Sequence, residues 1–420
     1  MLKELSLENF KAFGTRSAVS TGSITVLLGP NGSGKSSLLQ ALTLLKQSRG
    51  STGLQASGNL IDLGSFDALV NAHSGVKYFT IGLTVSAEPV VVMQTGFEFK
   101  DVTYTASFDS SGLKGHTLQF TGPFRISASW DRELGAKVSP EAIELPFGLI
   151  GLQMSTTVAL PVSLGKIPRG AAPPGVVDDA VRQFTAQFNR IHDILGNTYV
   201  VPPNRGFTRP AYPLLDDTVE DFFANRSPDD QAAAILTTIH LKPECQEMIS
   251  ELSWKALGLR LKVRPLRGKQ LAAEATDGEV ANLVNQGFGA NQLMLLLAQL
   301  VIAPPGSILG VEEPEIHLHP AAQARLADIF VALSEQGKQL IITSHSEHVL
   351  MGLLTRIADG RLDPKRLRVY YLGRDDGGTA KPEELPVDAR GRLKGGLKGF
   401  FEANIDELQE YLQAMSKRKA

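Results

Sequence analysis

The sequence has almost no cysteine, because Cys245 is the single one in 420 residues. One thiol cannot form an internal disulfide, and it excludes a zinc site built from several thiolates. The chain also has no apolar run near the roughly 20 residues that a membrane-spanning helix needs. Its start, "MLKELSLENF", alternates apolar and polar residues as a strand does and not as a signal peptide does. We therefore expect a protein of the reducing cytoplasm with no membrane partner.

The sequence also lacks a large excess of charge of either sign. Lys and Arg number 42, Asp and Glu number 44, and the net charge at pH 7 is −2. No global positive field would draw the chain onto DNA, although a local basic face is left open. The composition, with 43% hydrophobic residues, is that of an ordinary globular protein with one large α/β domain or two domains.

The hydrophobic pattern changes along the chain. Both ends combine short apolar runs with helical spacing, which predicts a P-loop-type α/β fold with a mostly parallel sheet flanked by helices. Alternating segments over 78–130 predict an inserted lobe of antiparallel strands. Four parts are predicted. They are an N-terminal piece of the α/β domain (1–76), a β-rich lobe (77–175), a helical or mixed insertion (176–280) and a C-terminal piece of the α/β domain (281–420).

Individual elements can be placed within these parts from the same pattern. Residues three and four apart on one face predict helices, and short apolar runs rich in β-branched residues predict buried strands. The predicted helices lie over 177–195 and 228–257, and the predicted strands over 23–28, 307–311, 339–343 and 367–372.

A glycine-rich segment follows the apolar run 23–28. "GPNGSGKSS" matches G-x-x-x-x-G-K-[ST] through Gly29, Gly34, Lys35 and Ser36. Glycines let the backbone curl and aim N–H groups at phosphate oxygens, and the helix that follows adds partial positive charge. Lys35 would reach the β- and γ-phosphates, and the Ser36 hydroxyl would bind Mg²⁺. The candidate residues for nucleotide binding are Gly29, Asn31, Gly32, Ser33, Gly34, Lys35, Ser36 and Ser37.

Two further strand ends carry polar side chains. "SILGVEEPE" ends in Glu312 and Glu313, and "QLIIT" runs into His345. Parallel sheets bind ligands at the carboxyl ends of their strands, so we expect these residues to meet the glycine-rich loop. Glu312 would hold Mg²⁺, Glu313 would act as general base toward the attacking water, and His345 would contact the γ-phosphate.

The stretch "GVEEPEIHLHP" allows a second interpretation. Glu315, His317 and His319 alternate at strand spacing and could converge on zinc, although a complete ligand set is not evident. Pro320 is a good first residue for a helix. We therefore favour a turn that leads from the strand into a helix and faces a partner subunit.

These motifs give the sequence a resemblance to ABC-type ATPases of the branch that includes the SMC, RecF and OLD-type proteins. "LSLENFKAFG" resembles the opening strands of that branch, "EEPEIHLHP" its Walker B segment, and "TSHSEHVL" its histidine switch. "NLVNQGFGANQ" stands where the signature motif lies. "IDLGSFDALV", "YVVPPNRG" and "GGLKGFFEANIDELQEYL" add a resemblance to bacterial defence-associated AAA ATPases.

The resemblance implies ATP and Mg²⁺ as cofactors and a head-to-tail homodimer, or a larger assembly, with ATP between P-loop and signature. Lys35 of one chain would then face Gly287, Gly289 and Asn291 of the other. Asn291 departs from the usual signature serine. The glutamine that relatives use beside Mg²⁺ after the first helix cannot be assigned, since Gln55 is a poor candidate and "DLGSF" is an alternative for its place. Arg205, in "PPNRGFTRP", has two open interpretations: a phosphate or partner contact, or an ordinary loop arginine.

The segment after His345 has 75 residues and no D-x-D motif, and Asp375-Asp376 fits the tip of a hairpin. We therefore expect no fused TOPRIM nuclease. The favoured hypothesis is an ATP-hydrolysing switch of a bacterial anti-phage defence system that controls a separate effector protein. One alternative is a DNA-clamping repair ATPase of the RecF or SMC kind. Another is a nucleotide-binding scaffold with little turnover.

Overall fold

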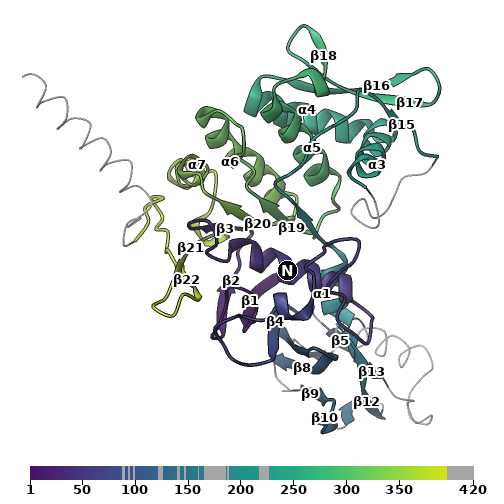
Figure 1. Ribbon diagram of the computed structural model, residues 1–420, viewed down its shortest axis with the longest axis vertical. Coiled ribbons are helices and arrows are strands. Elements are labelled where there is room, and N and C mark those ends of the chain that lie inside the picture. Colours follow the sequence, from purple (N-terminus) through teal and green to yellow (C-terminus); the bar gives the residue numbers. More distant parts are fainter. Residues whose placement is uncertain are drawn as a thin grey trace, which may run out of the picture.

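Three parts follow one another along the long axis of the molecule in the computed structural model (Figure 1). An antiparallel sheet lies at one end, a mostly parallel central sheet with its helices lies in the middle, and a smaller lobe of helices and short strands lies at the other end. The structure describes residues 1–87, 90–92, 95–97, 100–121, 126–139, 142–145, 148–158, 160–164, 186, 189–216 and 227–394.

The central sheet has six strands in the order β14-β19-β20-β3-β21-β22, all parallel except β22. Continuous apolar runs form its middle strands because a parallel sheet is covered on both faces. The four strands predicted from such runs are confirmed. The bounds are β3 (Ile24–Leu28), β14 (Thr198–Val201), β19 (Ile308–Glu312), β20 (Gln339–Ser344), β21 (Leu367–Arg374) and β22 (Ala380–Glu384).

Alternate residues of β3 belong to different hydrophobic cores, as side chains on opposite faces of a strand should. Val26 lies in the core formed with the helices that follow β14, whereas Leu27 lies in the core formed with α1 and the antiparallel sheet. The central sheet is therefore covered on both faces. Its helices are α1 (Lys35–Ser48), α6 (Pro320–Glu335) and α7 (Glu347–Ala358), whereas α5 (Phe288–Ile302) lies in the smaller lobe (Figure 1).

The antiparallel sheet has the order β10-β9-β8-β7-β4-β1-β2 and confirms the antiparallel strands predicted over 78–130. Because β1 pairs with β4, the division predicted between residues 76 and 77 falls inside one continuous sheet. Its strands are β1 (Leu2–Glu8), β2 (Ser17–Ser20), β4 (Tyr78–Ser86), β7 (Asp101–Asp109), β8 (Gly112–Thr121), β9 (Ile126–Asp131) and β10 (Gly135–Ser139). Smaller sheets contain β5 (Val90–Val92), β6 (Thr95–Phe97), β11 (Ala142–Leu145), β12 (Gly148–Thr157) and β13 (Leu160–Leu164).

The third part contains the helical region predicted over 228–257 and a small antiparallel sheet. Two helices replace the single predicted region, because Pro243 disfavours a helical conformation at the residue before it, and α3 ends before Lys242. Most of the helix predicted over 177–195 lies outside the described residues. The elements are α3 (Pro228–Leu241), α4 (Pro243–Leu257), β15 (Tyr212–Pro213), β16 (Arg260–Leu266), β17 (Gln270–Thr276) and β18 (Val280–Asn282). In the part of the chain that the structure describes, no helix is both long and apolar enough to cross a membrane.

The predicted α/β fold with an added antiparallel sheet and a helical insertion is therefore confirmed. Strand β14 belongs to the central sheet although the insertion was predicted to include it, since it pairs in parallel with β19. The predicted hairpin tip is also confirmed: Asp375 accepts hydrogen bonds from Thr379 across the turn between β21 and β22.

One buried side chain joins the antiparallel sheet to the central sheet. Gln339, at the start of β20, is 2% exposed. Its Oε1 accepts a hydrogen bond from the Leu2 amide at 3.0 Å, and its Nε2 donates to the carbonyl oxygens of Leu2 at 2.8 Å and Gly22 at 2.9 Å. Gln339 therefore satisfies backbone groups at the junction of the two sheets.

Replacing Gln339 with leucine should lower the free energy of unfolding by about 2–4 kcal/mol, because buried backbone groups would lose their partners. Urea unfolding measures this loss, and the dependence of the free energy on urea concentration should be the same for the variant and the wild type. The exposed Gln270 provides a matched control, and Gln270→Leu should change stability by less than about 0.5 kcal/mol. Equal stability of the two variants would contradict the role given to Gln339.

Candidate nucleotide site

The glycine-rich loop connects the carboxyl end of β3 to the first turn of α1. Gly29 has φ 144° and Gly34 has φ 100°, values that residues with a Cβ rarely adopt. A Cβ at Gly29 would lie 2.4 Å from the Leu372 carbonyl oxygen, and one at Gly34 would lie 3.0 Å from the Ala380 Cβ. The β21–β22 hairpin thus packs directly against the loop, and both glycines are required for this close approach.

Two polar side chains of the loop, those of Ser33 and Lys35, are buried. Lys35, the first residue of α1, is 6% exposed, and its Nζ donates to the carbonyl oxygens of Gly29 at 2.8 Å and Pro30 at 2.9 Å. Burial lowers the pKa of Lys35, and the charges of Glu313 and Glu315 oppose that effect. The Ser33 hydroxyl oxygen is buried with no hydrogen-bond partner within the described part of the chain.

These donors fit a phosphate group. A lysine ammonium and a serine hydroxyl can both donate to phosphate oxygens, as can the amides of a loop that opens a helix. Among the other predicted loop residues, Asn31 and Gly32 are exposed, and Ser37 is buried in the first turn of α1.

The structure brings the two predicted metal ligands together. The Ser36 hydroxyl donates to the Glu312 Oε2 at 2.7 Å, although 276 positions separate the two residues in the chain. Burial raises the pKa of Glu312, and the Ser36 hydrogen bond partly opposes this shift. A hydroxyl and a carboxylate oxygen are hard oxygen donors of the kind that Mg²⁺ prefers.

Glu313 and His345 follow neighbouring strands and lie beside each other. The Glu313 Oε1 is 3.5 Å from the His345 Nε2, and each side chain is about one-third exposed. Glu313 has φ 44°, and its amide donates to the Thr343 carbonyl oxygen at 2.9 Å. Burial lowers the pKa of His345, and the Lys35 charge lowers it further. Both effects favour the neutral form of the imidazole.

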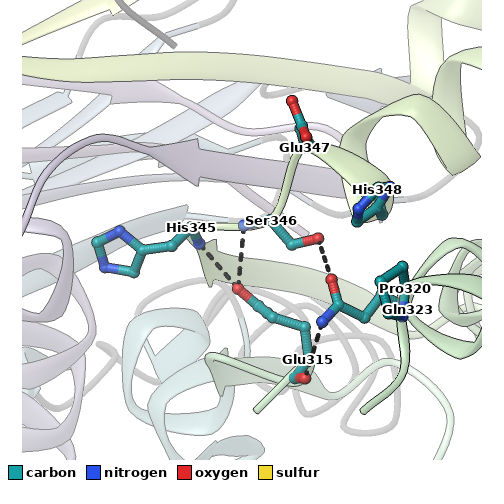
Figure 2. A pocket seen from close by; sticks show the side chains of 7 residues that line it. All are labelled: Glu315, Pro320, Gln323, His345, Ser346, Glu347 and His348. Carbon is teal, nitrogen blue, oxygen red and sulfur yellow. Dashed lines mark hydrogen bonds between the residues drawn. The ribbon is translucent and has the colours of Figure 1, made fainter. Parts of the chain in front are cut away.

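Glu315 holds the segment that carries His345 (Figure 2). Glu315 is 6% exposed, and its Oε1 accepts hydrogen bonds from the Ser344 hydroxyl and from the amides of His345 and Ser346. Glu315, His345 and Ser346 line a pocket of about 430 Å³ together with Gln323. Sequence reasoning placed Glu315 in a turn and missed this contact, because its partners lie some 30 positions further along the chain.

The three side chains that would bind zinc in the alternative interpretation each have a different partner. Glu315 binds the segment after β20, His317 stacks edge-on against Phe288 at 4.9 Å, and His319 accepts a hydrogen bond from the Ala321 amide at the start of α6. No group of three His, Cys, Asp or Glu residues that could hold a metal ion occurs among the described residues. The stretch instead forms the predicted turn into the helix that begins at Pro320.

The predicted signature residues lie at the start of α5. Gly289 packs against the turn after β19, since a Cβ there would lie 2.4 Å from the His317 carbonyl oxygen. Gly287 directly precedes the helix. Asn291 is 6% exposed, and its side-chain amide accepts from the Phe207 amide at 2.7 Å and donates to the Phe207 carbonyl oxygen at 2.9 Å. A contact of Asn291 with the nucleotide of another chain would have to replace these two bonds.

Three basic residues lie near the site; Lys11 and Arg374 were not predicted there, and Arg205 had been left open. The Lys11 Nζ donates to the Gln40 side chain at 2.7 Å. Burial lowers the pKa of Lys11, and the charge of Glu312 opposes this effect. The Arg374 Nη2 donates to the Gly32 carbonyl oxygen of the loop at 2.8 Å. Since Arg374 ends a strand beside β3, its position could have been expected from the parallel pattern.

Arg205 is the third of these residues, and it lies behind the two glutamates. Its guanidinium donates to the carbonyl oxygens of Glu312 and Glu313. Arg205 is therefore not an ordinary solvated loop arginine, because its side chain is buried and donates to backbone carbonyl oxygens of its own chain.

Solved structures with a related arrangement are heads of Smc proteins. The SmcHead bound to the C-winged helix domain of ScpA is 15% identical, with 92% of this chain and 98% of that chain covered and a TM-score of 0.46. The SMC head domain from Thermotoga maritima is 14% identical, with 92% and 99% covered and a TM-score of 0.41. An Smc head domain with an extended coiled coil, bound to the C-terminal domain of ScpA from Pyrococcus furiosus, is 14% identical, with 98% and 99% covered and a TM-score of 0.45. These similarities are remote.

A family assignment comes from the sequence itself. No curated protein matches the chain. The family described as "AAA domain, putative AbiEii toxin, Type IV TA system" matches residues 24–118 and 189–351, which is more than half of the chain. The matched residues include the glycine-rich loop, both strand-end glutamates and His345. The chain belongs to this family of AAA-domain ATPases.

Proposed function

We propose that this chain binds and hydrolyses ATP and uses the cycle as a molecular switch. The observation that carries the proposal is the 2.7 Å contact between Ser36 of the glycine-rich loop and Glu312. Glu313 directly follows Glu312, and His345, at the end of the neighbouring strand β20, lies 3.5 Å from it. A phosphate cradle, a hydroxyl–carboxylate pair and a separate carboxylate are the groups that phosphoryl transfer to water needs.

Each residue has a distinct part in the proposed reaction. Lys35 and the loop amides bind the β- and γ-phosphates. Ser36 and Glu312 would hold Mg²⁺, which neutralises phosphate charge when bound. Glu313 accepts a proton from the attacking water, and neutral His345 donates a hydrogen bond to the γ-phosphate. To bind the phosphates, the Lys35 Nζ must give up its hydrogen bonds to the Gly29 and Pro30 carbonyl oxygens, which accept from it in this structure.

We infer a head-to-tail homodimer as the assembly that ATP controls. The start of α5 is accessible, because Phe288 is 56% exposed beside Gly287. The amides at a helix start can bind the phosphates of a nucleotide held by Lys35 of another copy. ATP would then join two copies, and hydrolysis would release them.

We further propose a role in bacterial anti-phage defence, in which the nucleotide state controls a separate effector protein. The family description names a toxin of a type IV TA system, which supports a module of at least two proteins. Co-purification from the native host and phage plating on a deletion strain test this role. No co-purifying protein together with unchanged plating would contradict it.

Phosphate release by the wild-type chain with ATP and Mg²⁺, compared with that by Lys35→Ala, tests hydrolysis. We expect turnover in the wild type only, and equal rates would favour a nucleotide-binding scaffold. Retention of DNA on filters at two salt concentrations tests the DNA-clamping alternative. Binding that requires ATP and falls steeply with salt would favour that alternative over the effector switch.

A further inference from the structure

Arg205 is a buried charged residue behind the candidate catalytic glutamates. Arg205 lies in the loop after β14 and is 8% exposed. Burial lowers the pKa of Arg205 to about 10, while the charges of Glu315, Glu313 and Glu312 oppose the shift. The guanidinium is therefore charged at neutral pH. A buried charge is costly unless polar partners surround it, so the contacts of Arg205 indicate its role.

The guanidinium of Arg205 binds backbone carbonyl groups. Nη1 donates to the Pro202 carbonyl oxygen at 2.8 Å and to the Glu312 carbonyl oxygen at 2.9 Å, and Nη2 donates to the Glu313 carbonyl oxygen at 3.0 Å. One planar fork thus holds two consecutive peptide groups at the end of β19. A lysine ammonium lacks this fixed geometry.

The backbone that Arg205 holds is strained. Glu313 has φ 44°, the left-handed region that is unfavourable for a residue with a Cβ. The Glu313 amide is bound by the Thr343 carbonyl oxygen, and the Glu313 carbonyl group is bound by Arg205. Both sides of the strained residue are therefore fixed, and its carboxylate lies beside His345 as a result.

The same loop is fixed to the start of α5. Phe207, two residues after Arg205, exchanges two hydrogen bonds with the Asn291 side chain. Gly206, between Arg205 and Phe207 in the chain, has φ 142°, and a Cβ there would be 3.4 Å from the Asn291 Oδ1. The loop therefore connects the predicted signature helix with the two glutamates inside one chain.

We propose that Arg205 is a positioning residue for ATP hydrolysis, which holds the strained turn that aims Glu313 at the attacking water. Asn291 anchors the Arg205 loop to α5. This inference rests on the proposed function, since it takes Glu313 as the general base. Arg205 acts on the reaction through the Glu313 backbone and contacts no reacting atom.

Substitution of Arg205 should lower kcat and leave ATP affinity nearly unchanged. We expect Arg205→Ala to reduce kcat about 100-fold, because a small displacement of a catalytic group can cost that much. Arg205→Lys should reduce kcat about 10-fold, since the ammonium can replace one of the two contacts to the glutamate carbonyl oxygens. The Kd of a fluorescent ATP analogue should change by less than about 3-fold in either variant, since the hydrogen bonds of the Arg205 guanidinium go to the Pro202, Glu312 and Glu313 carbonyl oxygens and not to the glycine-rich loop.

A double-mutant cycle with Glu313→Gln separates positioning from a general structural role. Because Arg205 acts through Glu313, the double variant Arg205→Lys/Glu313→Gln should hydrolyse ATP at the rate of Glu313→Gln alone. Arg356 provides the control: it pairs with Asp328 between α6 and α7, and Arg356→Lys should act independently of Glu313→Gln.

The outcomes distinguish this inference from the proposed function. Independent effects of Arg205→Lys and Glu313→Gln, or an unchanged kcat in Arg205→Ala, would overturn the positioning role while wild-type hydrolysis stands. A wild-type rate equal to that of Lys35→Ala would overturn the proposed function and this inference together. If Arg205→Ala does not fold, the Arg205→Lys cycle decides the question.

Discussion

Replacing Glu313 with glutamine should reduce kcat for ATP hydrolysis by about 10²- to 10⁴-fold, the usual contribution of a general base. An amide has nearly the shape of a carboxylate but cannot accept the proton of the attacking water. The Glu313 side chain is one-third exposed, and His345 Nε2 lies 3.5 Å from its Oε1. The substitution should therefore leave the melting temperature and the affinity for ATP almost unchanged. Steady-state phosphate release and binding of a fluorescent ATP analogue measure the two effects.

A matched control for this substitution is Glu279→Gln, because Glu279 is an exposed glutamate in the turn after β17. It should hydrolyse ATP at the wild-type rate. A Glu313→Gln enzyme within about twofold of the wild-type kcat would show that another group activates the water.

Replacing Lys35 with alanine should weaken ATP binding by about 30-fold to several thousand-fold. Truncating one partner of a buried, hydrogen-bonded charge pair typically costs about 2–5 kcal/mol. Lys35 is buried at the first turn of α1, and its Nζ lies within 2.9 Å of two loop carbonyls, where phosphate oxygens would take over as acceptors. Titration with a fluorescent ATP analogue in the presence of Mg²⁺ measures the change in Kd.

Lys46 provides the control on the same helix. It is 8% exposed, and its Nζ donates to the Thr198 carbonyl oxygen and lies over the Tyr199 ring. Lys46→Ala should lower the melting temperature and leave the Kd for ATP within about 3-fold, since Lys46 points to β14 and not to the loop. Equal loss of ATP affinity in the two variants would contradict the specific role of Lys35.

The parts of the site that are local in sequence could be predicted from it. Gly29, Gly34 and Lys35 follow one another within one loop, and their spacing alone indicates a phosphate cradle. The pairing of Ser36 with Glu312 is distant in the chain, but it follows from a general rule. Parallel strands present their carboxyl ends at one edge of a sheet, so two strand-end motifs meet there.

Contacts that depend on a particular side-chain partner could not be predicted. Arg205 binds carbonyl groups more than 100 positions away, and no spacing pattern encodes a bond to a backbone oxygen. From the sequence, the Asn291 side chain could face another chain or its own. In the structure it exchanges two hydrogen bonds with the Phe207 backbone. Alternation in β1 indicated a strand without naming its neighbour, because period-two patterns specify a buried face and not a pairing partner.

The most direct test of the ATP-driven switch is the molar mass of the Glu313→Gln variant by size-exclusion chromatography with light scattering. With ATP and Mg²⁺, binding without hydrolysis should hold two chains together, and we predict the mass of a dimer or a larger closed assembly. With ADP, or with Lys35→Ala added to the variant, we predict the mass of fewer chains. An unchanged mass with saturating ATP, in a sample that demonstrably binds ATP, would contradict the account.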